Sequence, residues 1–427
     1  MNKPTRHKFA NLYQLASGIS SKPEQAGHGS PFLSFSTVFN NYFLPNELTD
    51  RMDTSEQEQK KYTINEGDIF LTRTSEVIDE LGMSSVALKT YQKATYSGFL
   101  KRLRPTQEKI TYPKFMAFYL RSPLFRKTMT NNAVLTLRAS LNEEIFSYLD
   151  LFLPEYDDQV KAGDFLYLLS QKIDCNNRIN AELEAMTKTL YDYWFVQFDF
   201  PDANGKPYKS SGGKMVYNAT LKREIPAGWS PCELSEIISR SATGLNPRDN
   251  FKLGYGENYY VTIKNVSNGK IVLDGKCDRI DDEALDIINR RSQLLPGDVL
   301  FTSIEPVGIT YLIQDKPTNW NINESVFTIR PNYDKTTSEH LFLLLSSSEM
   351  KAFTKNSSSG SIHKGIRHGV LKTFKLAYGD KTLIDRFSAA TKPILNRIDV
   401  IDKENQHLTQ LRDWLLPMLM NGQVTVA

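Results

Sequence analysis

The chain has 427 residues, of which 40% are hydrophobic and 24% charged, and its three cysteines lie far apart in the sequence. This length predicts more than one domain, and the composition argues against general disorder and against a disulfide-rich secreted fold. No run of 18 apolar residues occurs, and the basic N-terminus lacks an apolar stretch, so we expect no membrane contact and a cytoplasmic location. The net charge of +3 is too small to indicate a polyanionic partner by itself.

Residues 1–155 form the first half of a long internal repeat, and residues 225–379 form the second half. The two halves align at an offset near 228 residues, and each contains a Gly-Asp pair followed by an apolar run. Short β-type runs alternate with helical runs in each half, which predicts two globular domains of the α/β or α+β class in tandem. The aligned segments are 66–72 with 296–302 and 115–154 with 340–379.

A long helix is predicted after each half, at 156–200 and at 380–421. Apolar residues recur there at three- and four-residue spacing, which indicates a narrow coiled-coil seam between the two helices. Alternatively, each helix is amphipathic and packs only on its own domain. The seam residues that we expect to pair the helices or to dock a partner are Leu183, Leu190, Trp194, Asn405, Leu408 and Leu415.

Turn and cap residues mark the ends of these segments. Asp380 is expected to cap the second helix, and Asn421-Gly422 to end it, with 422–427 as a C-terminal tail. Residues 201–224 contain Gly, Ser, Pro and Lys, which predicts an exposed linker or a hairpin between the halves.

Positive charge is concentrated in two zones of the nearly neutral chain. Residues 81–142 contain eleven Lys and Arg and a single acid, Glu108, whereas residues 340–379 contain six Lys and Arg and a single acid, Glu349. Two separate basic zones favour two surfaces that face a polyanion. The competing interpretation is that they are ordinary solvated faces of unrelated domains.

Motifs that carry common enzymatic chemistry are missing from the sequence. There is no phosphate-binding Gly-x-x-x-x-Gly-Lys-Ser/Thr loop, no Gly-x-Gly-x-x-Gly, no Asn/Asp-Pro-Pro-aromatic tetrad and no His or Cys spacing typical of zinc sites. We therefore expect no catalytic residue, no metal and no cofactor in this chain.

Four motifs in the correct order resemble the DNA-specificity subunits of type I restriction-modification systems. They are the opening Ile225-Pro226-Ala227-Gly228-Trp229, the strand 296–302, the mid-chain segment 190–198 and the C-terminal segment 411–423. The likeness covers essentially the whole chain. It departs at the start of the first repeat, which lacks a Pro-x-Gly-Trp opening and begins instead near Leu12.

This resemblance implies two target-recognition domains, each reading one half of a split site in double-stranded DNA. The two long helices would pair as an antiparallel coiled coil that measures the gap between the halves. They would also dock two methyltransferase (M) subunits, which carry the adenine methylation, and restriction (R) subunits would add later.

For DNA contacts we expect the loops after the Gly-Asp strands and the basic segment near the end of each domain. Arginine can bind guanine through two hydrogen bonds, while lysine and serine more often contact phosphate. The candidates are Arg73, Lys101, Arg102, Arg104 and Arg138 in the first domain and Ser303, His363, Lys364 and Arg367 in the second.

Two other functions remain open from the sequence. The chain could be a scaffold whose coiled coil joins proteins, or an enzyme with an unrecognised nuclease site. A steep fall of DNA affinity with salt would argue against the scaffold. Cleavage or methylation of DNA by the purified chain alone would argue for the enzyme.

Overall fold

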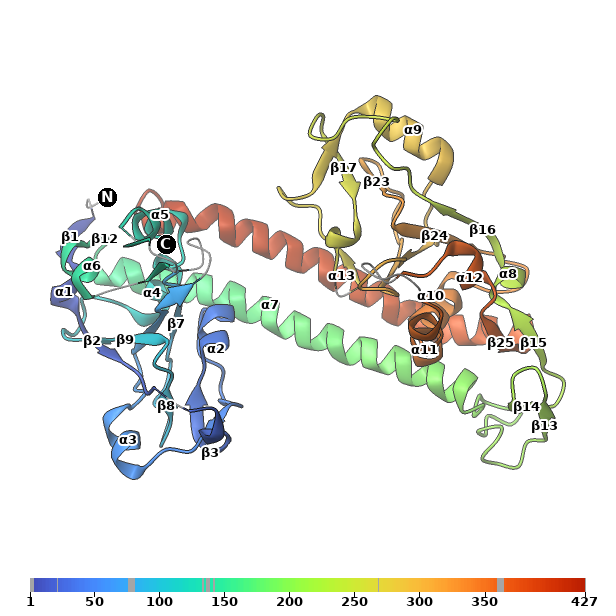
Figure 1. Ribbon diagram of the computed structural model, residues 1–427, viewed down its shortest axis with the longest axis horizontal. Helices are drawn as coiled ribbons and strands as arrows, with labels where there is room; N and C mark the ends of the chain where they lie inside the picture. The colour runs from blue at the N-terminus through green and yellow to red at the C-terminus, as the bar shows by residue number, and fades with distance from the viewer. Residues whose placement is uncertain are drawn as a thin grey trace. The chain divides into compact units, whose positions relative to one another are not determined.

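The computed structural model describes residues 4–20, 22–75, 81–132, 134–135, 139–140, 143–267, 269–358 and 365–426. The chain divides into two compact units, shown in Figure 1. Unit 1 consists of Met1–Asn176 and Glu404–Ala427, and unit 2 consists of Asn177–Lys403. Each unit therefore contains one half of the predicted repeat together with part of both long helices.

Unit 1 is built around a four-stranded antiparallel sheet in the order β2-β9-β5-β7. Strand β5 is buried at all four of its residues, Ile69–Thr72, and this explains its unbroken apolar run. Phe9, Phe115 and Phe118 pack in the core against the sheet. The other strands of this sheet are β2 (Tyr13–Ser17), β9 (Leu100–Pro105) and β7 (Ser84–Val86).

A smaller three-stranded sheet, β4-β3-β8, completes unit 1. Strand β3 (Ala26–Leu33) pairs antiparallel with β4 (Arg51–Met52) and parallel with β8 (Thr95–Tyr96). The remaining short elements of unit 1 are β1 (Thr5–Lys8), α1 (Phe9–Leu12), a 3₁₀ turn (Pro23–Gln25), α2 (Phe35–Asn40), α3 (Glu56–Lys61), β6 (Thr74–Ser75), α4 (Pro113–Tyr119), α5 (Pro123–Asn132), β10 (Val134–Leu135), β11 (Ala139–Ser140), α6 (Glu143–Tyr148) and β12 (Asp150–Leu153).

Unit 2 repeats this arrangement strand by strand. Its four-stranded antiparallel sheet has the order β16-β24-β21-β22, and its three-stranded sheet has the order β20-β17-β23. Here too the central strand β17 pairs antiparallel on one side and parallel on the other. The repeat and the mixed α/β class predicted from the sequence are thus confirmed. The strands are β16 (Ile238–Thr243), β24 (Val326–Pro331), β21 (Val299–Thr302), β22 (Thr310–Leu312), β20 (Asp278–Ile280), β17 (Asn258–Val261) and β23 (Trp320–Ile322).

The segment between the halves is packed onto unit 2. Phe200 stacks on Tyr208 and on Trp229, with ring centroids 4.8 Å and 5.3 Å apart, and a hairpin follows. Of the two expectations for residues 201–224, the hairpin is the one observed. The other short elements of unit 2 are β13 (Met215–Asn218), β14 (Arg223–Pro226), β15 (Ser230–Glu233), α8 (Leu234–Ile237), a 3₁₀ turn (Ile263–Asn265), β18 (Val266–Ser267), β19 (Lys270–Ile271), α9 (Asp282–Ser292), α10 (Ser338–Ser346), α11 (Ser348–Ser357), α12 (His368–Lys372) and β25 (Lys375–Tyr378).

Two long helices follow the two halves, as predicted. Helix α7 (Tyr156–Tyr191) has 36 residues and continues into a π-helical turn, Asp192–Val196, and α13 (Lys381–Met420) has 40 residues. Asp380 caps α13 by accepting a hydrogen bond of 2.7 Å from the Leu383 amide. Gly422 follows the helix with φ of 64°, a conformation that favours glycine.

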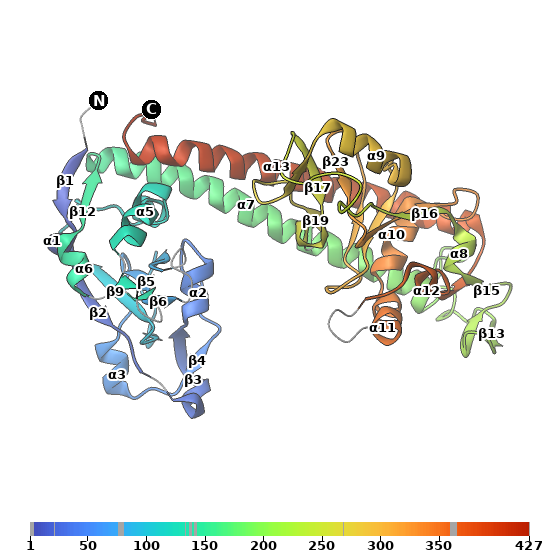
Figure 2. The ribbon, with the colours of Figure 1, turned by 45° about the horizontal axis from the view of Figure 1, so that its top comes forward.

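The two helices contact each other inside each unit, and they run in opposite directions. In unit 1, the Asn176 amide donates to Asn405 Oδ1 at 2.9 Å and to Glu404 Oε2 at 2.8 Å. The end of α13 lies beside the start of α7 there (Figure 2). In unit 2, the Asn180 amide donates to Asp402 Oδ1 at 2.7 Å. No helix in the described part of the chain is long and apolar enough to cross a membrane.

Candidate nucleic-acid interface

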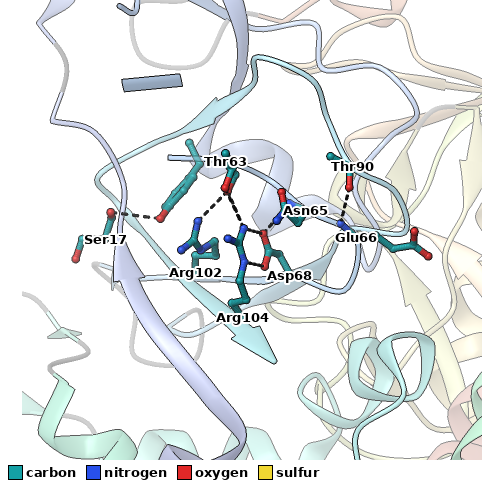
Figure 3. Close-up of polar contacts among 9 residues, drawn as sticks. Ser17, Thr63, Asn65, Glu66, Asp68, Thr90, Arg102 and Arg104 are labelled. Carbon is teal, nitrogen blue, oxygen red and sulfur yellow. Dashed lines mark hydrogen bonds and ion pairs between the residues drawn. The ribbon is translucent and has the colours of Figure 1, made fainter. Parts of the chain in front are cut away.

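The Gly-Asp motif of unit 1 forms an ion pair inside the domain (Figure 3). Asp68, which is buried, accepts two hydrogen bonds from Arg104, from Nε at 2.7 Å and from Nη2 at 2.6 Å. Its second oxygen also accepts from the Asn65 amide at 2.7 Å, and Arg104 Nη2 reaches the Thr63 carbonyl at 3.2 Å. The hydrogen bonds with Asp68 raise the pKa of Arg104 above its ordinary value. The motif therefore ties the turn before β5 to strand β9.

Unit 2 contains the same Asp-Arg ion pair in the equivalent strands, and we call this pair the clamp. Arg330 on β24 donates to Asp298 through Nε at 2.7 Å and through Nη2 at 2.8 Å. Asp298 accepts from the Leu295 amide at 2.9 Å, and Arg330 reaches the Gln293 carbonyl at 2.9 Å. Because the same contacts recur, the Gly-Asp pair seen in the sequence marks a structural clamp of the repeat.

Lys101, Arg102 and Arg104, which the sequence predicts to contact DNA, all have hydrogen-bond partners within unit 1. Lys101 and Arg102 are 4% and 6% exposed. The Lys101 ammonium donates to Ser17 Oγ at 2.8 Å, and Arg102 donates to the Thr63 carbonyl at 2.9 Å. Lys101 and Arg102 are thus held inside the fold, because burial of a charge requires partners within the protein, whereas the side chain of Arg104 is 26% exposed.

Other cations of the first basic zone also serve the interior of unit 1. Arg121 donates to the carbonyls of Ser84, Val38, Phe39 and Asn41, at 2.6 to 2.9 Å. Burial lowers the pKa of Arg121 to about 10, so it stays charged at neutral pH. Lys114 pairs with Asp164 on α7 at 2.7 Å. The described cations of this zone therefore divide between those with partners in the protein and the exposed ones, which are Lys89, Lys93, Lys109 and Lys127.

The remaining DNA candidates are divided between exposed and buried positions. Arg73 is exposed directly after β5, and Arg367 is exposed directly before α12. Ser303 is 5% exposed, and its hydroxyl donates to the Ser325 carbonyl at 2.8 Å, so it does not present a free surface group. Three candidates, Arg138, His363 and Lys364, lie outside the described residues. In the second basic zone, Lys351, Lys355 and Lys375 are exposed.

The helix residues selected from the heptad pattern mostly face inward. Trp194 is buried with its ring centroid 5.5 Å from that of Phe387, Asn405 pairs with Asn176, and Leu183, Leu190, Leu408 and Leu415 are half-buried. Trp194, Leu190 and Leu415 pack in or against the cores of their own units, and the docking of a partner by the six residues stays a prediction. The apolar residues that α7 and α13 leave exposed are Leu168, Leu411 and Trp414 in unit 1 and Ile179, Met186 and Val400 in unit 2.

A second repeated feature was not singled out from the sequence. Gly27-His28-Gly29 and Gly254-Tyr255-Gly256 are 227 residues apart, close to the offset of the rest of the repeat. All four glycines have φ between 84° and 90°. The shared offset was the signal that could have revealed it. Among the described residues, no group of three or more His, Cys, Asp or Glu is placed to hold a metal ion.

Comparison with known proteins gives one consistent family. The model of the type I restriction modification DNA specificity domain matches residues 19–185 and 226–379. The HindI type I restriction enzyme specificity subunit of Haemophilus influenzae is 23% identical, over 92% of this chain and 94% of that protein. The MjaIX specificity subunit of Methanocaldococcus jannaschii is 21% identical, over 64% of this chain and 60% of that protein.

A solved structure has the same fold. The type I restriction-modification S subunit from M. genitalium superposes with a TM-score of 0.59 at 13% identity, covering 97% of this chain and 95% of that one. The family model matches two long segments that together make up most of the sequence, and each contains one Asp-Arg clamp. The chain therefore belongs to the type I restriction modification DNA specificity family.

Proposed function

We propose that this chain recognises a bipartite DNA site, one half with each unit, and directs adenine methylation and restriction by partner subunits. The observation that carries the proposal is the duplication of a whole domain: both sheets, their strand orders and the Asp-Arg clamp recur. Two copies of one domain with different surface residues suit a site whose halves differ in sequence.

The exposed cations of each unit would supply the phosphate contacts. Arg73 and Arg367 remain our candidates among the described residues, joined by Lys351, Lys355 and Lys375 in unit 2. Arg138, His363 and Lys364 remain candidates from the sequence. Neutralising phosphates makes duplex affinity strongly dependent on salt, and base contacts then add the discrimination.

The paired helices would set the spacing between the half-sites. At about 1.5 Å per residue, helices of 36 and 40 residues extend roughly 54 and 60 Å. Equivalent faces of B-DNA one turn apart are separated by about 34–36 Å. Helices of this length are therefore sufficient to hold two reading surfaces one turn apart.

Partner subunits would dock on the exposed apolar residues of the helices. Trp414 and Leu411 are 64% and 41% exposed and lie three residues apart on α13, so they share one face. Exposed tryptophan is typical of the residues that dominate protein interfaces. We propose that M subunits bind this face, that R subunits join the resulting complex, and that the catalytic steps belong to these partners.

The decisive experiment is to map methylated adenines across the host genome with and without this gene. The proposal predicts a split motif whose methylation disappears when the gene is deleted. An unchanged methylation map would overturn it.

One binding assay and one cleavage assay separate the alternatives. For the chain with its M partner, log affinity for duplex DNA should fall steeply with log salt, whereas a scaffold that binds peptides would not respond in this way. The purified chain alone should leave DNA uncut, and cleavage would favour the enzyme hypothesis.

A further inference from the structure

A three-residue bulge of strand β3 projects one side chain from unit 1. Ala26 and Ser30 both pair with Met52 of β4, so Gly27-His28-Gly29 loops out between them. Both glycines have positive φ, 90° and 88°. A Cβ on Gly29 would lie 2.6 Å from the Met52 carbonyl oxygen and 2.9 Å from Asp53 Cα. Only glycine fits there, and His28 is held exposed at the tip of the bulge.

Unit 2 presents Tyr255 by the same construction. The Gly254 amide donates to the Arg279 carbonyl at 2.8 Å, and Asn258 pairs with Ile280 of β20. Residues 255–257 therefore loop out against the neighbouring strand. Gly254 and Gly256 have φ of 88° and 84°, and a Cβ on Gly256 would lie 2.5 Å from Asp281 Cα. Tyr255 is 64% exposed, although a large aromatic side chain is normally buried at least in part.

The strand that supports each bulge also carries an arginine at the same position. The support is Arg51-Met52-Asp53 in unit 1 and Arg279-Ile280-Asp281 in unit 2, 228 residues apart. Arg51 is exposed. Arg279 lies 3.7 Å above the ring of Tyr259 and donates to the Glu257 carbonyl at 2.8 Å, which orders it beside the bulge. Each unit thus has the same frame of two glycines and one arginine around a different residue.

Building on the proposed function, we propose that His28 and Tyr255 are specificity-determining residues, one for each half of the DNA site. The frame repeats whereas the presented residue does not, as required when two copies of a domain read different bases. A histidine ring can donate to or accept from base edges. A tyrosine can offer its hydroxyl, or its ring to a thymine methyl group.

The arginine of each frame has a separate role in this proposal. Arg51 and Arg279 are the same residue in both units, so they suit the part of DNA that is the same at every site, the phosphate backbone. They would position the bulge on the duplex, while the presented residue discriminates between bases.

In unit 1 the bulge lies where DNA can reach it. Strand β3 is at the end of the unit away from α7 in both views (Figures 1 and 2). Partner subunits docked on the exposed residues of the helices would bind away from this end of the unit.

The test uses the full chain in complex with its M partner and maps methylated sites for His28→Ala and Tyr255→Ala. Each variant should relax base preference by about tenfold or more at one or two positions, within one half-site only, and the two variants should affect different halves. Wild-type preference in both variants, or changes confined to the same half, would overturn the inference.

A matched control and the arginine variants complete the design. Tyr217, 65% exposed on β13, gives the control Tyr217→Ala, which should leave the motif unchanged. Arg51→Ala and Arg279→Ala should weaken binding about equally for all sequences and reduce the salt slope by about one.

The two proposals fail in different ways. A wild-type complex without any site-specific methylation would remove the proposed function itself. A wild-type motif that survives both His28→Ala and Tyr255→Ala would remove only the assignment of these two residues.

Discussion

At the scale of single residues, positive charge in this protein divides into internal and external groups. Asp68 and Asp298 each have 1% of their side chains exposed, and each accepts two hydrogen bonds from one arginine. A guanidinium and a carboxylate matched in this way form a rigid connection between strands. The cations that remain outside are those available to a polyanionic partner.

Replacing Asp68 by Asn should destabilise unit 1 by about 2 kcal/mol, because the partly buried Arg104 loses its charge partner. Hydrogen exchange should show the loss at the amides of β5 and β9, while the equivalent strands β21 and β24 keep wild-type protection. Asp150→Asn is the control, since it removes an ion pair with Arg6 at the surface. Equal effects of the two substitutions would contradict a structural role for the clamp.

His340 makes the stability of unit 2 depend on pH. It is 2% exposed, its Nδ1 lies 2.8 Å from Thr336 Oγ1, and burial lowers its pKa to about 3. Between about pH 6.5 and pH 3 this histidine is protonated in the unfolded chain but neutral in the folded chain. The free energy of unfolding therefore decreases as the pH falls from about 6.5 towards 3. The expected slope is about 1.4 kcal/mol per pH unit for this group.

Urea unfolding at pH 7 and pH 5 measures this effect. His340→Gln cannot take up the proton, so the variant should lose roughly 2 kcal/mol less than the wild type between these two pH values. The comparison uses the difference between pH values, and the packing cost of the substitution therefore cancels. Parallel pH profiles for the two proteins would exclude His340 as the source.

At the scale of elements, the helix pair is held by polar contacts at positions where the heptad pattern calls for apolar residues. Asn176 and Asn405 are 1% and 9% exposed and bond to each other in unit 1, and Asn180 bonds to Asp402 in unit 2. Polar groups at such positions cost stability but allow only one register, because a shifted helix would leave them without partners.

The single substitution Asn176→Leu should destabilise unit 1 by about 2 kcal/mol, since it leaves the buried Asn405 oxygen without this donor. Adding Asn405→Leu should restore at least half of the loss, because two leucines can pack against each other. A double-mutant cycle followed by urea unfolding measures the coupling. Additive losses would show that the two amides contribute independently.

At the scale of the whole molecule, the two units share two helices, and the boundary between units falls at Asn176-Asn177 in α7 and at Lys403-Glu404 in α13. A segment inserted at both boundaries would therefore lengthen the helices and leave the packing of each unit intact. This is the cleanest place to test whether the helices set the spacing of the recognised site.

Inserting four residues at each boundary, about one helical turn and roughly 6 Å, should lengthen the gap in the methylated motif by about two base pairs. Both half-site sequences should stay the same. Four residues inserted at Gly212, an exposed turn with no atoms near its Cβ position, are the control and should not alter the gap. An unchanged gap after the helix insertions would exclude the spacing role.

The sequence alone determined the repeat, the two long helices, the ends of α13 and the family, whereas α7 ends at Tyr191, before the predicted residue 200. These features depend on local or periodic patterns: the apolar run of β5, the heptads of α7 and α13, and the caps Asp380 and Gly422. Such patterns can be recognised in the sequence because residues close together along the chain produce them.

Only the tertiary structure decided which charges are available at the surface. Arg104 meets Asp68 across 36 residues, and Arg330 meets Asp298 across 32, so no local window could identify the partners. The positive φ of four glycines likewise distinguished His28 and Tyr255 from other polar residues. Folding brings strands together that are far apart in the sequence. These long-range contacts decide which cations have partners within the protein and which remain exposed to a partner such as DNA.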